Sequence, residues 1–202
     1  MTAIGLLGGT LNPPHRGHLA LALHARDQLG LERVELVPAG MPPHKAAAPQ
    51  ADAEARLAMC ELLVDGVDGV GVNPVEVARE GPSFTVDTLA ALHARDPDDE
   101  LTFILGADTA LTLAGWRSPE RLLQLCDLAV AVRAGSSQED AQATVAALDG
   151  AAARRMRFLA MEPVDVSSSL VRERVAAGLP VEELTGAAVA NYITDRGLYR
   201  EG

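Results

Sequence analysis

Two histidines follow a pair of glycines near the start of the chain, within the segment GGTLNPPHRGH that ends at His18. His15 and His18 are three positions apart, which places both imidazoles on one face of the first turn of a helix. A helix N-terminus favours anions because its first backbone N–H groups have no partner within the helix. Gly8 and Gly9 let the backbone approach a bound group closely. The segment therefore predicts a cradle for phosphate oxygens.

Simpler interpretations of these residues stay open. A glycine pair after a strand is often only a turn, and a histidine in a helix is more often a surface or core residue. Zinc binding by His15 and His18 would need further ligands, and no Cys or His pair at a suitable spacing supplies them. The segment matches neither the G-x-G-x-x-G dinucleotide fingerprint nor the P-loop pattern, which argues against an oxidoreductase and a P-loop enzyme.

A lysine lies in a second loop, Gly40–Pro49, and Lys45 is the only lysine among the 17 basic residues. This loop follows a predicted strand and so reaches the same edge of the sheet as the histidine segment. The ammonium group of Lys45 could contact a phosphate there as a point charge. The alternative is a lysine exposed to solvent on a loop, and chemistry alone does not decide between the two.

Three further positions combine polar groups with predicted strand or helix ends. Backbone N–H groups near Thr85 could hold a carboxylate, although Ser83 also suits an ordinary helix N-cap. Asp108 follows a strand that ends at Gly106 and could bind ribose hydroxyls, face a magnesium ion, or cap the next helix. Trp116 is the only tryptophan of the chain and could stack on a planar ring.

Two serines and an arginine form a fifth candidate, in which Ser167 and Ser168 start a predicted helix and Arg172 follows one turn later. Hydroxyls, helix N–H groups and a guanidinium together suit a polyphosphate. The plainer alternative is a serine N-cap followed by a surface arginine.

The elements that must position these residues alternate along the chain. Apolar runs predict strands at 3–7, 34–37, 70–77 in one or two pieces, 101–105, 128–132 and 157–161. Helical spacing predicts helices at 17–29, 51–64, 85–95, 108–113, 119–125, 139–148, 168–177 and 187–194, with a turn at 135–138. Uniformly apolar strands between helices favour an α/β fold, a doubly wound parallel sheet with helices on both faces. We expect one domain, 1–202, with a small helical part from about residue 166.

Composition excludes several classes of protein. The 202 residues are 48% hydrophobic and 22% charged, an ordinary globular balance. A net charge of −11 argues against a broad basic surface for nucleic acid. Cys60 and Cys126 stand among apolar neighbours, which indicates buried thiols in a reducing compartment. No basic leader and no run of roughly 18 to 20 apolar residues is present. We therefore expect a cytoplasmic protein without a nucleic-acid or membrane partner.

Taken in order, these segments resemble the nucleotidyltransferase superfamily with the H-x-G-H signature, and within it the bacterial nicotinate-mononucleotide adenylyltransferases. The resemblance runs from Ile4 to Tyr199 and implies a Rossmann-like nucleotidyltransferase fold. Leu11 stands where the family commonly has an aromatic residue, and Ser169 where threonine is common. The matching pieces are Gly8–His18, Pro42–Lys45, Ser83–Leu89, Gly106–Asp108 with Trp116, Arg133, Val166–Arg172, Val189, Tyr192–Ile193 and Leu198–Tyr199.

The resemblance implies transfer of the adenylyl group of ATP, accompanied by Mg²⁺, to nicotinate mononucleotide in NAD biosynthesis. It assigns catalytic roles to His15, His18, Lys45 and Arg172, with no metal held by the protein itself. It assigns ATP binding to Gly8, Gly9, Thr10, His18, Gly106, Asp108, Arg133, Ser167, Ser168 and Arg172. It assigns mononucleotide binding to Asn12, His15, Lys45, Phe84, Thr85, Trp116 and Arg117. A homo-oligomer is left open.

Other activities on the same fold stay open. The acceptor could be nicotinamide mononucleotide or phosphopantetheine, although phosphopantetheine enzymes usually have shorter chains without the S-F-T-x-D-T segment. A catalytically silent nucleotide-binding module is the alternative of another class. The intact pair of His15 and His18, together with Lys45 and Arg172, argues against a silent module.

Overall fold

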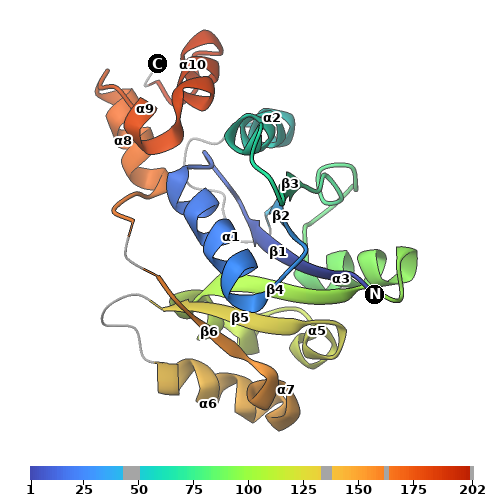
Figure 1. The fold of residues 1–202 in the computed structure, drawn as a ribbon. Coiled ribbons are helices and arrows are strands. Elements are labelled where there is room, and N and C mark those ends of the chain that lie inside the picture. Colours follow the sequence, from blue (N-terminus) through green and yellow to red (C-terminus); the bar gives the residue numbers. More distant parts are fainter. Residues whose placement is uncertain (43–50, 133–137, 162–163, 201–202) are drawn as a thin grey trace.

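The computed structural model describes residues 1–42, 51–132, 138–161 and 164–200 and contains the predicted doubly wound sheet (Figure 1). Within these residues all strands are parallel and are arranged in the order β3-β2-β1-β4-β5-β6. The fold class expected from the alternation of strands and helices is confirmed. The strands are β1 Ala3–Gly9, β2 Arg33–Pro38, β3 Val70–Val72, β4 Glu100–Gly106, β5 Asp127–Val132 and β6 Arg157–Ala160.

The longer helices lie within a few residues of their predicted positions. Two short helices, α7 and α9, are not predicted by the sequence. The extended segment 70–77 is a strand only to residue 72. The predicted helix 108–113 divides into α4 and a 3-10 helix at Leu113–Gly115. Most of the predicted turn 135–138 and of the loop 40–49 lies outside the described residues. The helices are α1 Arg16–Leu29, α2 Ala53–Val64, α3 Thr85–Arg95, α4 Ala107–Ala110, α5 Pro119–Leu125, α6 Gln138–Leu148, α7 Gly150–Arg155, α8 Ser168–Ala176, α9 Glu182–Thr185 and α10 Ala187–Asp195.

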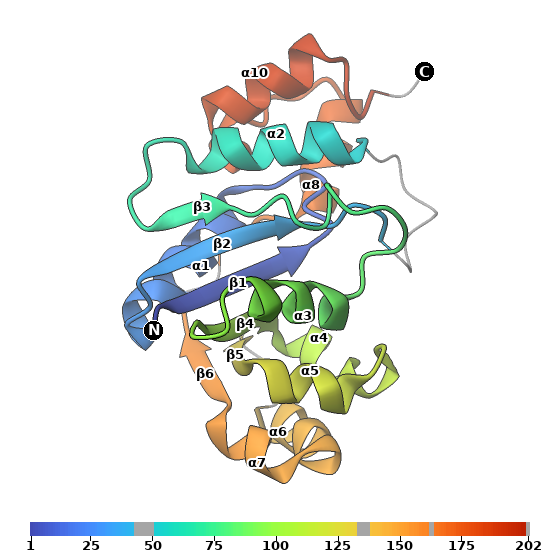
Figure 2. The same cartoon turned by 90° about the vertical axis from the view of Figure 1, so that its right-hand side faces the viewer.

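Alternating side chains of the strands supply two cores, one on each face of the sheet. Leu6 of β1 packs with Phe103 and Leu105 of β4 under helices α3 to α7. The intervening residues, Leu7 and Ile104, pack on the opposite face under α1, α2 and the C-terminal helices. Figure 2 shows α10 running beside α2. The last segment of the chain therefore covers the same face of the sheet as the helix that begins near the histidine pair.

Both cysteines are buried and free, one in each core, as their apolar neighbours predict. Burial raises the pKa of the Cys60 thiol and of the Cys126 thiol to about 12. Both groups therefore remain protonated near neutral pH and act as small apolar side chains. Among the helices formed by the described residues, none combines the length and the apolar character needed to cross a bilayer.

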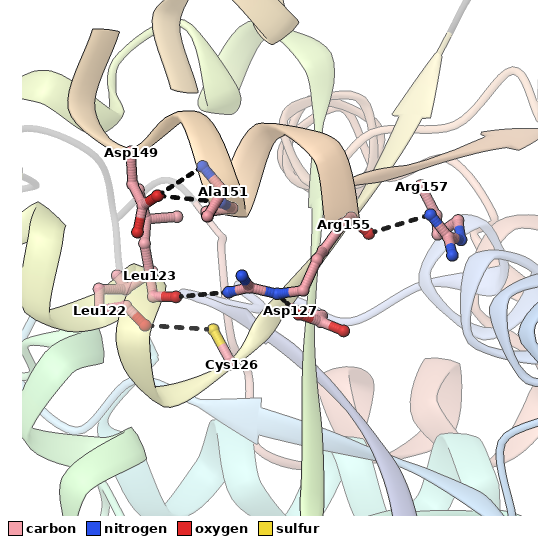
Figure 3. A network of polar contacts seen from close by, with 9 residues as sticks. Leu122, Leu123, Cys126, Asp127, Asp149, Ala151, Arg155 and Arg157 are labelled. Atoms are coloured by element: carbon pink, nitrogen blue, oxygen red, sulfur yellow. Dashed lines mark hydrogen bonds and ion pairs between the residues drawn. The ribbon is translucent and has the colours of Figure 1, made fainter. Parts of the chain in front are cut away.

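Polar contacts tie α7 to the edge of the sheet at which β5 begins (Figure 3). Asp149 caps α7 by accepting two backbone N–H groups, which hold the pKa of its carboxyl below the usual range. Arg155 donates to the Asp127 carboxylate at 2.7 Å and to the Leu123 carbonyl oxygen at 3.2 Å. These contacts lie at the amino ends of the strands, because Asp127 is the first residue of β5.

Gly40, just after β2, lies so close to a neighbouring backbone that there is no room for a side chain. A Cβ at this position would stand 2.2 Å from the carbonyl oxygen of Glu76, whereas a Cβ on Gly71 in β3 would meet nothing within 4 Å. We expect Gly40→Ala to lower the free energy of unfolding by about 1–3 kcal/mol, the usual cost of overpacking. Gly71→Ala is the control and should be neutral or stabilising. Denaturant titration measures both, and equal values would contradict the close approach.

Candidate functional site

A cleft with a volume of about 650 Å³ opens at the carboxyl ends of β1, β2, β4 and β5. The strand order reverses between β1 and β4, which is the position where doubly wound sheets bind ligands. Most of the predicted site residues that the structure describes line this cleft. They are Gly8, Gly9, Thr10, His15, His18, Phe84, Thr85, Gly106, Asp108, Trp116, Arg117, Ser167 and Ser168.

The other four predicted site residues fall into two groups. Lys45 and Arg133 lie outside the described residues. Asn12 and Arg172 are described but contact neighbouring segments of the protein.

The two histidines lie together at the start of α1. His15 is buried and forms the N-cap, and its ring stacks on that of His18 with centroids 3.7 Å apart. The backbone N–H of His15 donates to Nδ1 of His18 at 3.2 Å. Because Nδ1 is an acceptor in this bond, a neutral His18 carries its proton on Nε2. The structure therefore sets the tautomer of one imidazole and holds both beside the N-terminus of a helix.

Gly17, between the histidines, is required by packing. A Cβ there would lie 2.9 Å from Cγ1 of Val166 and 3.1 Å from the His15 ring. Gly8 meets a similar limit, because its Cβ would lie 2.9 Å from the ring of Phe103. Gly17 therefore lets α1 and the segment before α8 approach closely, and Gly8 leaves room for the Phe103 ring at the end of β1.

Ser168 and Arg172 of α8 support the first loop, residues 10–15, which connects β1 with α1. The Ser168 hydroxyl donates to the Pro13 carbonyl oxygen at 2.8 Å. Arg172 donates from Nη1 to the Asn12 carbonyl oxygen at 2.8 Å and from Nη2 to the Ser169 hydroxyl at 3.1 Å. The guanidinium that the sequence places with phosphates thus binds backbone and hydroxyl oxygens of the protein.

Two serines at helix starts have different roles. Ser167 is the N-cap of α8, and its hydroxyl accepts a backbone N–H of the first turn at 3.1 Å. The predicted N-cap role of Ser83 is wrong, because Phe84 occupies the N-cap position of α3. The Ser83 hydroxyl instead accepts the backbone N–H groups of Gly40 at 2.9 Å and Met41 at 3.2 Å. The Ser83 hydroxyl, which the local pattern assigns to the helix N-terminus, therefore binds a loop that is distant in sequence.

Asn12 faces the C-terminal segment of the chain. Its buried Oδ1 accepts the Tyr199 hydroxyl at 2.8 Å and the Ala51 backbone N–H at 3.1 Å. Burial raises the pKa of Tyr199, so the phenol stays protonated and remains a donor. The amide expected to bind a mononucleotide joins the first loop to the residue before the N-cap of α2 and to Tyr199.

Aromatic and charged side chains form another wall of the cleft. Trp116 packs edge-on against Phe103, with ring centroids 6.1 Å apart. The Arg117 guanidinium lies 4.7 Å from the centroid of the Phe84 ring and pairs with Asp87 at 3.5 Å. A planar group with a negative charge fits such a wall, because it meets apolar rings beside a cation.

Two more predicted positions lie at helix starts within the cleft. Gly106 ends β4 and is the N-cap of α4, so Asp108 stands exposed in the first turn of that helix and does not occupy its N-cap. Thr85 is the first residue of α3. Among the described residues, no group of three or more His, Cys, Asp and Glu side chains is arranged to hold a metal ion.

Sequence reasoning assigned no role to three residues of this region. Thr88 donates to the Glu76 carboxylate at 2.7 Å, and both residues are buried against the cleft. Arg56, only 2% exposed, binds the carbonyl oxygens of two loops. One signal was available, because Arg56 precedes Met59 and Cys60 by three and four positions and so shares their buried face of α2.

The fold and the cleft define a Rossmann-like nucleotide-binding protein with a histidine pair at its ligand edge. The model of the cytidylyltransferase-like family matches residues 6–174. A protein of Symbiobacterium thermophilum, named "probable nicotinate-nucleotide adenylyltransferase", is 38% identical and covers 100% of this chain and 97% of its own length. A relative of the same name from Aeromonas salmonicida is 42% identical over 98% of this chain and 97% of its own. The chain therefore belongs to the cytidylyltransferase-like family, and within it to the nicotinate-nucleotide adenylyltransferases.

Solved structures agree on the fold. The nicotinic acid mononucleotide adenylyltransferase of Plasmodium falciparum, complexed with NaAD, superposes with a TM-score of 0.76. It is 14% identical, and the alignment covers 98% of both chains. The arrangement of the sheet is therefore shared with a structure whose sequence is very different.

The bond between Tyr199 and Asn12 can be tested by removing one hydroxyl. We expect Tyr199→Phe to lower the free energy of unfolding by about 0.5–1.5 kcal/mol, the net value of one buried hydrogen bond. Tyr192→Phe is the matched control, since Tyr192 is only partly buried and contacts Arg196 through its ring. Denaturant titration gives both values. A loss no greater than that of the control would show that the Tyr199 bond adds no stability.

Proposed function

We propose that the protein transfers the adenylyl group of ATP to nicotinate mononucleotide, producing nicotinate adenine dinucleotide and pyrophosphate in NAD biosynthesis. The observation that carries the proposal is the stacked pair of His15 and His18 at the start of α1, in the cleft that Trp116 also lines. Relatives named for this activity and 38% and 42% identical support it.

The proposed reaction needs no protein nucleophile. A phosphate oxygen of the mononucleotide attacks the α-phosphorus of ATP, the new O–P bond forms, and the bond to the leaving pyrophosphate breaks. The attacking phosphate is already ionised near neutral pH, so the site must align two phosphates and stabilise their charge. ATP would enter with Mg²⁺, which phosphate oxygens and water would mainly hold.

The phosphate side of the cleft would be formed by the first loop and two helix starts. Donors from His15, His18 and the backbone at Gly8–Thr10 would hold the reacting phosphates. The N-terminus of α8 at Ser167 and Ser168 would face the departing pyrophosphate. Arg172 would act through the loop that it holds.

The remaining assignments concern the adenosine of ATP and the bridging phosphate. Gly106 and Asp108 would lie beside the adenosine ribose, and Arg133 beside the adenine. Lys45 would add positive charge near the bridging phosphate. These roles are part of the proposal and follow the family resemblance.

The base side of the cleft would select the acid. Trp116 would stack on the pyridine ring, and the backbone N–H of Thr85 and the Arg117 guanidinium would take the nicotinate carboxylate. The position of Arg117 over the Phe84 ring supports this arrangement, since it keeps a cation on the aromatic wall.

Pyrophosphate release tests the proposal directly. The protein with ATP and Mg²⁺ receives nicotinate mononucleotide, nicotinamide mononucleotide or phosphopantetheine in parallel. We expect strong release with the acid and little with the amide, because the amide offers no negative charge to the Arg117 guanidinium and the Thr85 N–H. Equal release with both mononucleotides would remove the carboxylate pocket, and release with phosphopantetheine alone would replace the acceptor. Binding of ATP without any release would identify a silent module.

The role of His18 is tested by truncation. We expect His18→Ala to lower kcat by about 10²- to 10³-fold, the usual loss of one donor to transition-state charge, with the fold intact by circular dichroism. His24→Ala is the matched control, since His24 lies on the exposed side of the same helix. A kcat of the His18 variant equal to that of the control would exclude this residue from the mechanism.

A further inference from the structure

Arg56 is an arginine almost wholly enclosed by the protein, with 2% of its surface exposed. Its guanidinium donates to three carbonyl oxygens, from Nη1 to Thr10 at 2.8 Å, from Nη2 to Gly40 at 3.0 Å and from Nε to Ala51 at 3.2 Å. None of the salt bridges found among the described residues includes it. Burial lowers its pKa, but an arginine remains charged at neutral pH. Within the described part of the chain, the hydrogen bonds found for this buried charge go to backbone carbonyl groups.

Two of these carbonyl groups, those of Thr10 and Gly40, lie just beyond the point where the pairing of β1 with β2 ends. The last paired residues are Gly9 and Pro38, and the Gly9 carbonyl oxygen accepts the Ala39 backbone N–H at 2.9 Å. Just beyond this point the carbonyl oxygens of Thr10 and Gly40 both accept hydrogen bonds from Arg56. One guanidinium thus continues the connection between the two strands after their backbones separate.

The loops joined in this way carry the two segments with predicted phosphate contacts. Thr10 belongs to the loop that leads to His15, and Gly40 precedes the segment Pro42–Lys45. The peptide between Gly40 and Met41 is held at both ends, its carbonyl by Arg56 and its N–H by the Ser83 hydroxyl.

The first loop also needs support because of its backbone. Leu11, directly after Thr10, has a φ of +50°, a conformation that a side-chain-bearing residue rarely adopts. Such a conformation persists only where the surroundings hold it. A planar guanidinium suits this task, because its donors have a fixed relative geometry that an ammonium group lacks.

We propose that Arg56 is a positioning residue for adenylyl transfer, which sets the separation and orientation of the loops after β1 and β2. The inference rests on the proposed function for its kinetic part. It acts through backbone groups, since Arg56 itself does not line the cleft. Loosening the bridge would misalign the reacting phosphates more than it would weaken the binding of each substrate.

The kinetic test compares Arg56→Lys and Arg56→Met with Arg155→Met. The control removes another arginine that joins a carboxylate and a backbone carbonyl, but at the opposite edge of the sheet (Figure 3). We expect both Arg56 variants to lose about tenfold to hundredfold in kcat, with a smaller change in KM for ATP, because small misplacements of reacting groups are costly. The control should keep kcat. Thermal unfolding ensures that each protein is assayed while folded.

Arg56→Lys separates geometry from charge. A lysine keeps the positive charge but cannot bind the three carbonyl oxygens in the same plane. A loss as large as that of Arg56→Met supports positioning by the guanidinium fork. Full activity of Arg56→Lys would overturn the proposal, as would a kcat loss in Arg155→Met equal to that of the Arg56 variants.

Hydrogen exchange supplies a readout without catalysis. Peptides that cover residues 8–18 and 36–42 should exchange at least several-fold faster in Arg56→Lys than in the native protein, and Arg155→Met should leave them unchanged. If Arg56→Met does not fold, Arg56→Lys and Ser83→Ala, which loosens the Gly40–Met41 peptide from its other end, carry the test. Unchanged exchange in both would overturn the proposal. Absence of pyrophosphate release by the native protein would refute the proposed function and leave the exchange result valid.

Discussion

Buried backbone carbonyl groups at the ends of β1 and β2 lose their partners in the sheet, and the architecture of the cleft depends on how these partners are replaced. A buried carbonyl without a partner is costly, so side chains from elsewhere must supply donors. Arg56 serves the carbonyls of Thr10 and Gly40, and Arg172 serves that of Asn12. Each of these hydrogen bonds connects the first or second loop to α2 or α8, which cover the same face of the sheet as α1. The loops are thereby held by the same packing that forms the core.

This arrangement gives several polar residues of the motifs a structural role in place of the expected ligand-binding role. Asn12, Ser168 and Arg172 are all typical of phosphate or sugar binding, yet their described contacts are with the protein itself. The groups that line the cleft include the N-termini of α1, α3 and α8, the two imidazoles, Asp108 and Arg117. The site is therefore built in two layers. An outer layer holds the loops in shape, and an inner layer of helix N-termini and imidazoles lines the cleft.

The charge of the protein fits this division. A chain with a net charge of −11 repels polyanions over most of its surface, so a phosphate must be held by local fields. The N-termini of α1, α3 and α8 lie at the rim of one cleft and supply such fields. Because these dipoles are fixed before a ligand arrives, little reorganisation is needed when charge develops during phosphoryl transfer. The acidic surface and the anion-binding cleft are thus compatible.

By itself, the sequence determined the order of strands and helices, the parallel sheet, and the segments that meet at its carboxyl edge. These features depend on local periodicity and on glycines at strand ends, which a single sequence displays. The sequence did not predict the short helices α7 and α9, because four to six residues carry too little periodicity. Only the tertiary structure decided which hydrogen-bond partner each polar side chain contacts. Ser83 binds a loop 43 residues away, and Arg172 and Tyr199 reach Asn12 across 160 and 187 residues. Such partners are chosen by burial and by proximity in the folded chain, and local sequence patterns contain neither.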